Sequence, residues 1–215
     1  MMHATQPVTP PLTHPQRRRL LAATAAILAA GPFLKGCSPE PLSFQSTDIT
    51  GASFAQGLAL IDHTGRLRTL ADFKGKIVVV FFGFTQCPDV CPTSMLTMAE
   101  AKRLLGKDGE KLQVLLITVD PERDTLPLLK EYMANFDPTF LAMRPEPHEL
   151  KAVAESFKVH FQKVDGPTPT SYTMDHSAGK YIFDTEGAVR LFSSYGTATS
   201  VIAEDISKLL KSMER

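Results

Sequence analysis

The chain has 215 residues, with 23 basic and 23 acidic side chains and a formal net charge of +0. This neutrality gives no support for nucleic-acid binding, which relies on an excess of basic residues. Three cysteines are too few for a disulfide scaffold, and the length left after an N-terminal segment suits one domain with a sizeable core.

The first 36 residues are predicted to be an export signal or a membrane anchor. Arg17, Arg18 and Arg19 precede an apolar stretch from Leu20 to Leu34, which is the order of a basic region and a short hydrophobic region. The stretch is shorter than the roughly 20 residues that span a membrane. Such a segment places the rest of the chain outside the cytoplasm.

The type of anchor depends on Cys37. Leu34-Lys35-Gly36-Cys37 is similar to a bacterial lipobox, in which the cysteine carries the lipid and becomes the new N-terminus. Cleavage near Ala29 and an uncleaved anchor are the alternatives. The segment that follows has two prolines and little periodicity. Residues 37–50 are therefore predicted to be a linker that tethers a domain over residues 51–215.

A small β-hairpin is expected near the start of this domain. Leu58–Asp62 and Arg66–Thr69 are separated by the turn residues His63–Gly65. The turn Leu70–Gly75 then leads into Ile77–Phe82. The continuous β-branched and aromatic side chains of that stretch predict a strand buried on both faces.

Two cysteines, Cys87 and Cys91, follow in the turn between this strand and a helix expected over Thr93–Leu105. Pro92 suits the first helical position, so Cys91 is expected at or beside the N-cap. The helix dipole there favours a thiolate, so the sequence predicts two sulfurs of low pKa. Such a pair forms a disulfide or holds a soft metal, and C-x3-C matches no structural zinc pattern.

Helices and strands alternate over the rest of the chain. Parallel strands joined by helices, then an antiparallel hairpin and a last helix, is the thioredoxin-like order. We therefore expect an α/β fold with a central mixed sheet flanked by helices, in which the loop entering the last hairpin lies against the cysteine turn. The expected elements are a buried strand over Gln113–Val119, a helix from Thr125 to about Phe136, a helix over Glu149–Ser156, an alternating strand over Phe157–Val164, a loop over Gly166–Thr173, strands over Lys180–Asp184 and Ala188–Ser193, and a helix capped by Ser200.

Two dithiol chemistries compete for the cysteine turn. In a thiol–disulfide exchanger, the outer thiolate attacks and the inner one resolves. Such enzymes usually have C-x-x-C and a cis-proline just before the hairpin strand, whereas this chain has C-x3-C and no proline after Pro169. In a copper site, two thiolates and an imidazole form a soft shell suited to Cu(I), and disulfide formation would remove it.

Two further interpretations of the cysteine pair are weaker. A buried, inert disulfide is disfavoured because pairs at a strand-to-helix turn are usually accessible. Peroxidatic chemistry is disfavoured because Phe84 and Val80 occupy the places where peroxiredoxins have threonine and proline.

A third ligand has to come from elsewhere in the chain, and His176 is the candidate. It lies in Met174–Ser177, within the loop that should face the cysteines. Asp175 either holds a surface histidine or orients the imidazole of a ligand. The other histidines are His3 and His14 in the export segment, His63 in a turn expected to be solvated, His148 at a helix start and His160 on a solvent-facing strand face.

Methionine sulfur also binds Cu(I), which makes Met95, Met98 and Met174 of interest. Met95 and Met98 lie three residues apart on the predicted helix, a spacing that favours core packing over metal binding.

Three charged residues, Asp120, Arg123 and Asp124, follow the second buried strand at the edge where the cysteine turn also lies. Two interpretations are open. They form either an acidic helix start with a local ion pair, or a polar rim that fixes the loop or meets a partner.

Several stretches, in order, resemble the Sco/SenC family, the thioredoxin-fold proteins of cytochrome c oxidase assembly. Together they cover about residues 45 to 215. They are Phe82–Pro92, which resembles the family's metal motif, Val119–Thr125 its second signature, Asp175-His176 its third, and Asp48–Ala52 with Asp72–Lys76 its N-terminal hairpin region.

This resemblance implies a membrane-anchored copper protein on the periplasmic side of the bacterial inner membrane. Cys87, Cys91 and His176 would bind Cu(I) or Cu(II) and deliver it to the CuA site of oxidase subunit II. The alternative is a thiol–disulfide reductase that uses Cys87 and Cys91 to keep the CuA cysteines, or those of a copper chaperone, reduced. A periplasmic copper donor or a thiol reductase is a further implied partner.

The chain departs from the family pattern at three places. Gln86 stands where the family often has histidine or tyrosine, and Thr185–Gly187 where it often has a Pro-Asp-Gly turn. Neither change touches an expected ligand. The lipobox-like Cys37 differs from the single membrane helix of many members, and this leaves the anchor type open.

Overall fold

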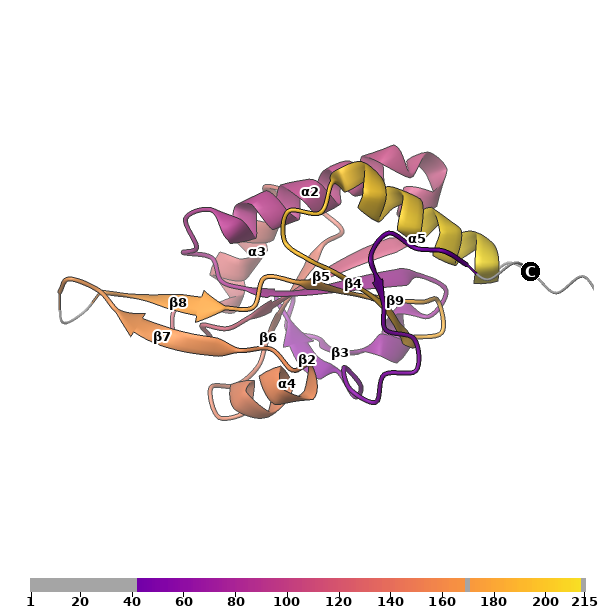
Figure 1. The fold of residues 1–215 in the computed structure, drawn as a ribbon. Coiled ribbons are helices and arrows are strands. Elements are labelled where there is room, and N and C mark those ends of the chain that lie inside the picture. The colour runs from indigo at the N-terminus through magenta and orange to yellow at the C-terminus, as the bar shows by residue number, and fades with distance from the viewer. Residues whose placement is uncertain (1–41, 169–170, 214–215) are drawn as a thin grey trace, which may run out of the picture. The chain divides into compact units, whose positions relative to one another are not determined.

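An eight-stranded mixed sheet organises residues 42–168 and 171–213, the part of the chain that the computed structural model describes (Figure 1). In spatial order its strands are β1 (Thr47–Asp48), β10 (Val189–Ser193), β9 (Lys180–Phe183), β4 (Ile77–Gly83), β5 (Leu112–Thr118), β6 (Leu141–Arg144), β2 (Ala59–Asp62) and β3 (Leu67–Thr69). The strands β4, β5 and β6 are parallel, whereas β9 and β10 pair antiparallel.

Helices cover both faces of this sheet. The helices are α2 (Val90–Leu104), α3 (Leu126–Ala134), α4 (Leu150–Ser156) and α5 (Thr199–Met213), with 3-10 turns η1 (Leu70–Phe73) and η2 (Gly106–Lys111). In Figure 1, α2 and α5 lie together above the sheet and α4 lies below it. Parallel strands with helical crossovers, followed by the β9–β10 hairpin and α5, form the thioredoxin-like arrangement predicted from the sequence.

The two central strands fix where a site can form. The ladder between β4 and β5 runs in register from Ile77 opposite Leu112 to Gly83 opposite Thr118, and every residue of both strands is buried. The apolar runs of the sequence therefore became the central strands, as predicted. Because both strands end at the same edge, the turn after β4 and the loop after β5 meet there.

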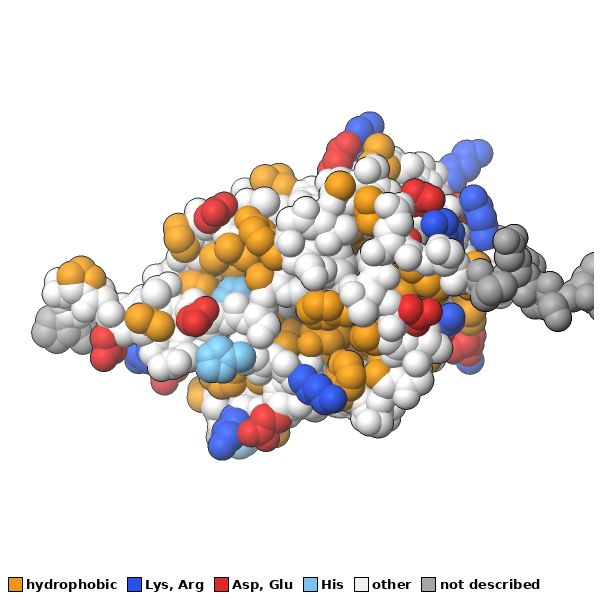
Figure 2. Space-filling view, in the orientation of Figure 1, with side chains coloured by type: hydrophobic (Ala, Val, Ile, Leu, Met, Phe, Trp, Pro, Cys, Tyr) orange, Lys and Arg blue, Asp and Glu red, His pale blue; other side chains and the backbone are white. Residues whose placement is uncertain are grey.

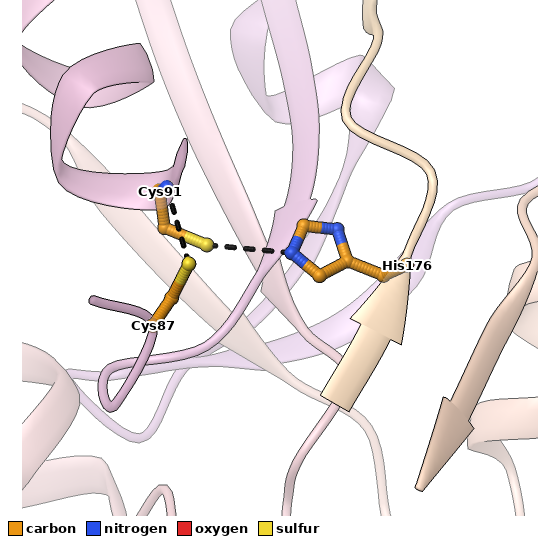
Figure 3. Close-up of side chains that lie close together, drawn as sticks. All are labelled: Cys87, Cys91 and His176. Carbon is orange, nitrogen blue, oxygen red and sulfur yellow. Dashed lines mark hydrogen bonds between the residues drawn. The ribbon is translucent and has the colours of Figure 1, made fainter. Parts of the chain in front are cut away.

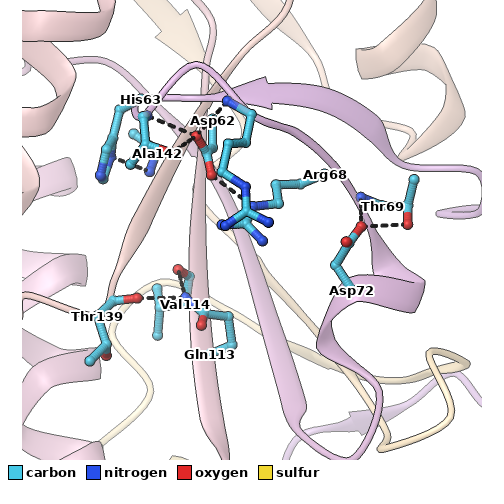
Figure 4. Close-up of polar contacts among 11 residues, drawn as sticks. Asp62, His63, Arg68, Thr69, Asp72, Gln113, Val114, Thr139 and Ala142 are labelled. Carbon is cyan, nitrogen blue, oxygen red and sulfur yellow. Dashed lines mark hydrogen bonds and ion pairs between the residues drawn. The ribbon is translucent and has the colours of Figure 1, made fainter.

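The expected N-terminal hairpin is present as β2 and β3, and Asp62 holds its turn (Figure 4). Its buried carboxylate accepts hydrogen bonds from the backbone and hydroxyl of Thr64, from the backbone of Arg66 and from the guanidinium of Arg68. Burial alone would raise the pKa of Asp62, but these hydrogen bonds outweigh it and lower the pKa to about 2.

His63 was expected to be solvated, and this expectation is wrong. Its Nδ1 accepts a hydrogen bond from the backbone N–H of Ala142 at 3.1 Å, and burial lowers the pKa of the imidazole. The contact ties the turn to β6, a strand that the sequence pattern did not predict.

The folded unit begins before residue 51. β1 pairs with β10, and the backbone N–H groups of Gln45 and Ser46 donate to the buried carboxylate of Asp205 at 3.0 and 2.7 Å. The segment 42–50, expected to be the end of a linker, therefore packs on the domain. Its strand is too short to show a hydrophobic period, and its partners lie far along the chain.

A second, two-stranded sheet consists of β7 (Phe161–Asp165) and β8 (Tyr172–His176), which extend away from the main sheet (Figure 1). The sequence predicted a strand over 157–164 and a loop over 166–173. The strand instead starts at Phe161, and the second half of the expected loop leads into β8, so that His176 ends a strand.

Within the described ranges, no helix has both the length and the apolar content needed to span a bilayer. The predicted export signal or anchor, with Cys37, lies outside the described residues.

Candidate metal centre

The cysteine turn joins the end of β4 to the start of α2. The helix begins at Val90, three residues before the expected range of Thr93–Leu105, with Asp89 as its N-cap. Cys91 therefore lies inside the first turn of the helix rather than at its cap. Pro92 is tolerated there because the first N–H groups of a helix have no intrahelical acceptor.

Gly83 leaves room for the buried sulfur. A Cβ atom at this position would lie 2.7 Å from Cε1 of Phe81 and 2.9 Å from Sγ of Cys91. Both distances are too short for non-bonded atoms, so the absence of a side chain at Gly83 allows Cys91 to pack against the end of β4.

The two cysteines are free thiols in different surroundings. Cys91 is completely buried, whereas Cys87 is partly exposed and its Sγ accepts a hydrogen bond from the backbone N–H of Cys91 at 3.4 Å. Burial, and then the neighbouring Cys87 sulfur, raises the pKa of the Cys91 thiol far above its usual value. The predicted low pKa of Cys91 is therefore wrong, because burial disfavours the thiolate.

Asp124 anchors the cysteine turn to the loop after β5. Its buried carboxylate accepts hydrogen bonds from the backbone N–H and the hydroxyl of Thr85 at 3.1 and 2.5 Å, and from the hydroxyl of Thr118 at 2.6 Å. Burial raises the pKa of this carboxyl group despite these donors. Both interpretations of this region are supported in part, because Asp120 and Arg123 form a local ion pair while Asp124 fixes the cysteine turn to the loop.

His176 approaches the cysteines from the end of β8 (Figure 3). Its Nε2 lies 3.5 Å from Sγ of Cys91, and its Nδ1 lies 3.1 Å from the backbone oxygen of Ser177. A carbonyl oxygen only accepts, so the proton is assigned to Nδ1 and the lone pair of Nε2 faces the sulfur. Ser177 orients the imidazole, a role that the sequence had offered to Asp175.

Two aromatic rings hold the imidazole in place. The rings of Phe81 and Phe84 contact His176 edge-on, with centroid distances of 6.0 and 5.9 Å. Burial lowers the pKa of His176, against the opposing effects of the Ser177 carbonyl and Asp175. The ring is therefore kept neutral, which is the form that binds a metal.

Together these side chains form a candidate metal centre. One ligand atom from each of Cys87, Cys91 and His176 lies within 4.8 Å of the others. In Figure 2, hydrophobic side chains gather over the start of α2, beside the end of β8. Two sulfurs and one imidazole nitrogen in an apolar setting are the donors of a soft, low-coordinate ion such as Cu(I).

The other side chains considered from the sequence lie elsewhere. Met95 and Met98 are fully buried in the core, as predicted, and Met174 lines a pocket of about 230 Å³ beside β8. His148 and His160 are exposed to solvent.

Tyr132 is a neighbour of the site that the sequence analysis missed. Its hydroxyl is buried on α3 and has no hydrogen-bond partner among the described residues. Burial, and then the nearby Cys91 and Cys87, raises the pKa of its phenol. No sequence signal marks Tyr132. It lies four residues before Phe136, and such a spacing is typical of aromatic side chains that pack on each other, as these two rings do.

The fold and the site define a thioredoxin-like protein with a Cys/Cys/His group that could hold a metal ion. The sequence model of the SCO1/SenC family matches residues 46–211, and the chain belongs to this family.

Among curated relatives, the "SCO2-like protein" of Rickettsia felis is 38% identical over 129 residues, which is 60% of this chain and 63% of that protein. The match thus spans less than two thirds of the rickettsial relative. "Protein sco1" of Schizosaccharomyces pombe is 34% identical over 203 residues, 91% of this chain and 75% of that protein.

Among solved structures, copper-bound ScoI of Bradyrhizobium japonicum is 34% identical with a TM-score of 0.64, over 78% of this chain and 99% of that one. Copper-bound yeast Sco1 is 29% identical with a TM-score of 0.65, over 79% of this chain and 90% of that one.

Proposed function

We propose that this protein is an extracytoplasmic copper metallochaperone for assembly of the CuA site of cytochrome c oxidase. One observation carries the proposal: Cys87, Cys91 and His176 converge, with ligand atoms within 4.8 Å of one another. Membership of a family with copper-bound structures supports copper as the cargo.

The chemistry of the three groups suits a carrier. The neutral imidazole of His176 is oriented before any metal binds, so that ordering it adds little to the cost of binding. Copper would displace the proton of the Cys91 thiol, since thiolates and not thiols bind the metal.

The proposed setting is the periplasmic side of the bacterial inner membrane, with the N-terminal segment as the tether and Cys37 as the candidate lipid site. The proposed partners are subunit II of the oxidase, as copper acceptor, and a periplasmic copper donor or thiol reductase. The basic-then-apolar order of residues 17–34 supports export.

A thiol–disulfide reductase is the second candidate function. The observation that favours it is the unequal exposure of the sulfurs: Cys87 is partly exposed and Cys91 is buried beside it. This is the arrangement of an attacking outer thiol and a resolving inner thiol. The substrates would be the CuA cysteines or those of a copper chaperone.

The test measures copper stoichiometry and the sulfur-to-copper absorption of the reduced full chain, wild type against His176→Ala. We expect one copper per wild-type chain, and loss of tight binding in the variant because one of three ligands is gone. His160→Ala is the matched control, since that imidazole is exposed and lies outside the site.

Copper binding that survived His176→Ala would overturn the ligand set. Exchange of dithiols with a generic disulfide should remain nearly intact in the variant, because both cysteines are retained. A wild-type rate equal to that of a thioredoxin would favour the reductase.

A further inference from the structure

The loop between β5 and α3, residues 119–125, contacts both halves of the metal centre. On one side, Asp124 binds Thr85 in the cysteine turn. On the other side, Arg123 binds Tyr172 at the start of β8, the strand that ends in His176. One short loop therefore reaches the two segments that supply the ligands.

The β7–β8 hairpin needs such a contact. Among the residues that the structure describes, it forms a sheet of its own and shares no strand pairing with the main sheet (Figure 1). At its base, His160 and Ser177 exchange hydrogen bonds of 2.9 and 3.1 Å, but these join the two ends of the hairpin to each other. An isolated two-stranded hairpin is marginally stable in water, so its position depends on side chains that dock it.

Arg123 makes this docking contact in two ways. Its Nη1 donates to the backbone oxygen of Tyr172 at 2.9 Å, and its guanidinium lies 3.6 Å from the centre of the Tyr172 ring. The same guanidinium lies 5.9 Å from the ring of Phe84, which itself contacts His176. Arg123 thus sits between the cysteine turn and the histidine strand.

Asp120 forms hydrogen bonds with both Arg123 and Tyr172. Its buried carboxylate accepts a hydrogen bond from Nε of Arg123 and another, of 2.9 Å, from the hydroxyl of Tyr172. Lys163 lies 3.8 Å from the centre of the Tyr172 ring, but it is half exposed and its ion pair with Glu122 is at the surface. Asp120 is buried and Arg123 and Tyr172 are partly buried, so the less exposed members of the cluster are those that join the loop to β8.

We propose that Arg123, held by Asp120, is a positioning residue that docks the β7–β8 hairpin and so places the His176 imidazole beside the two cysteines before copper binds. Asp120, Arg123 and Tyr172 form what we call the hairpin latch. This inference rests on the proposed function, because it concerns how the third ligand of the same copper site is held.

The experiment compares Arg123→Met with Lys163→Met in the full chain. Each removes one cation from the Tyr172 ring, but only the first breaks the hydrogen bonds to β8 and Asp120. We expect Arg123→Met to weaken Cu(I) binding about tenfold or more in competition with a chromophoric chelator. Amides of residues 161–165 and 172–176 should also exchange hydrogen faster in the copper-free variant, while Lys163→Met stays close to wild type in both measurements.

A second comparison separates positioning from general destabilisation. In a His176→Ala background, Arg123→Met should cause no further loss of Cu(I) affinity, because the latch acts through the imidazole. Equal losses with and without His176 would overturn the proposal. Tyr172→Phe, which removes only the hydroxyl bond to Asp120, is a milder variant and should show a smaller effect of the same kind if Arg123→Met does not fold.

The outcomes also separate this inference from the proposed function. Wild type that fails to bind copper, or His176→Ala that binds it as tightly as wild type, would contradict the metal centre itself. Loss of binding in His176→Ala together with full binding and unchanged amide exchange in Arg123→Met would contradict the latch alone.

Discussion

Lys180 is a buried cation near the metal centre. It is 2% exposed and lies on β9 between Phe81 of β4 and Ser193 of β10. Its amine is 5.9 Å from the centre of the Phe81 ring and makes no hydrogen bond or ion pair with the described residues. Burial lowers the pKa of this amine to about 8.

Lys180→Met should therefore stabilise the protein most at neutral pH. The unfolded lysine keeps its proton up to a pKa of about 10.4, so the folded wild type gains stability as pH rises from about 8 towards that value. Each unit of pKa difference corresponds to about 1.4 kcal/mol of unfolding free energy. The measurement is denaturant unfolding of wild type and variant at pH 7 and pH 10.

The expected advantage of Lys180→Met shrinks at the higher pH. Lys151→Met is the control, because that side chain is largely exposed and should show little change at either pH. An advantage of equal size at pH 7 and pH 10 would show that packing, and not the buried charge, is responsible.

At the scale of single residues, sequence motifs identified the candidate ligands but did not predict the raised pKa of the Cys91 thiol. The spacing of the cysteines and the topology selected Cys87, Cys91 and His176, and the structure brings these three together. The raised pKa of Cys91 was missed because it depends on burial, and the burial depends on the missing side chain of Gly83 and on Phe81.

At the scale of elements, the end of β4 makes a sharp prediction. Gly83→Ala would place a methyl group against both Phe81 and the Cys91 sulfur. Because the central strands leave no free space, we expect a loss of about 1–3 kcal/mol of unfolding free energy. Weaker Cu(I) binding should accompany it as Sγ is displaced. Denaturant unfolding and chelator competition measure the two effects.

The contact with sulfur can be isolated by a second substitution. In a Cys91→Ala background, Gly83→Ala should cost less unfolding free energy, since one of its two close contacts is then absent. Costs that simply add would mean that the methyl group and the sulfur do not meet.

Elements buried on both faces were predictable, and the hairpin that carries His176 was not. The stretches that form β4 and β5 are apolar apart from Gln113 and Thr118, and such runs predict strands that are buried on both faces. The alternation over residues 157–164 was misleading, because Lys158 leaves α4 in a left-handed conformation, with φ of 55°, and the strand starts only at Phe161. Helix-terminal geometry of this kind has a weak sequence signal when the residue is not glycine.

At the scale of the whole molecule, the N-terminal edge of the fold can be tested by truncation. The comparison is between a chain starting at residue 42 and a chain starting at residue 51. A chain starting at residue 51 loses β1 and leaves the buried Asp205 carboxylate without the N–H groups of Gln45 and Ser46. We expect a loss of about 3 kcal/mol or more in the free energy of unfolding, measured by denaturant titration.

Asp205→Asn provides the matching point change, because it removes the charge and keeps the size of the side chain. It should destabilise the chain starting at residue 42 more than the chain starting at residue 51. Equal stability of the two truncated chains would show that β1 contributes nothing.

The overall topology followed from the order of elements, since parallel strands joined by helices allow few arrangements. The pairing of β1 with β10 could not be predicted from this order. A two-residue strand has no period to detect, and its partner lies more than a hundred residues further along the chain.

For the proposed copper carrier, the unequal burial of the two sulfurs predicts an order of transfer. An acceptor arriving from solvent meets the partly exposed Cys87 first, while Cys91 stays behind Gly83 and the first turn of α2. In the proposed hand-over, ligand exchange therefore begins at Cys87, and the bond to Cys91 is the last to be replaced. On this proposal, the burial of each sulfur determines the order in which the copper–sulfur bonds are exchanged.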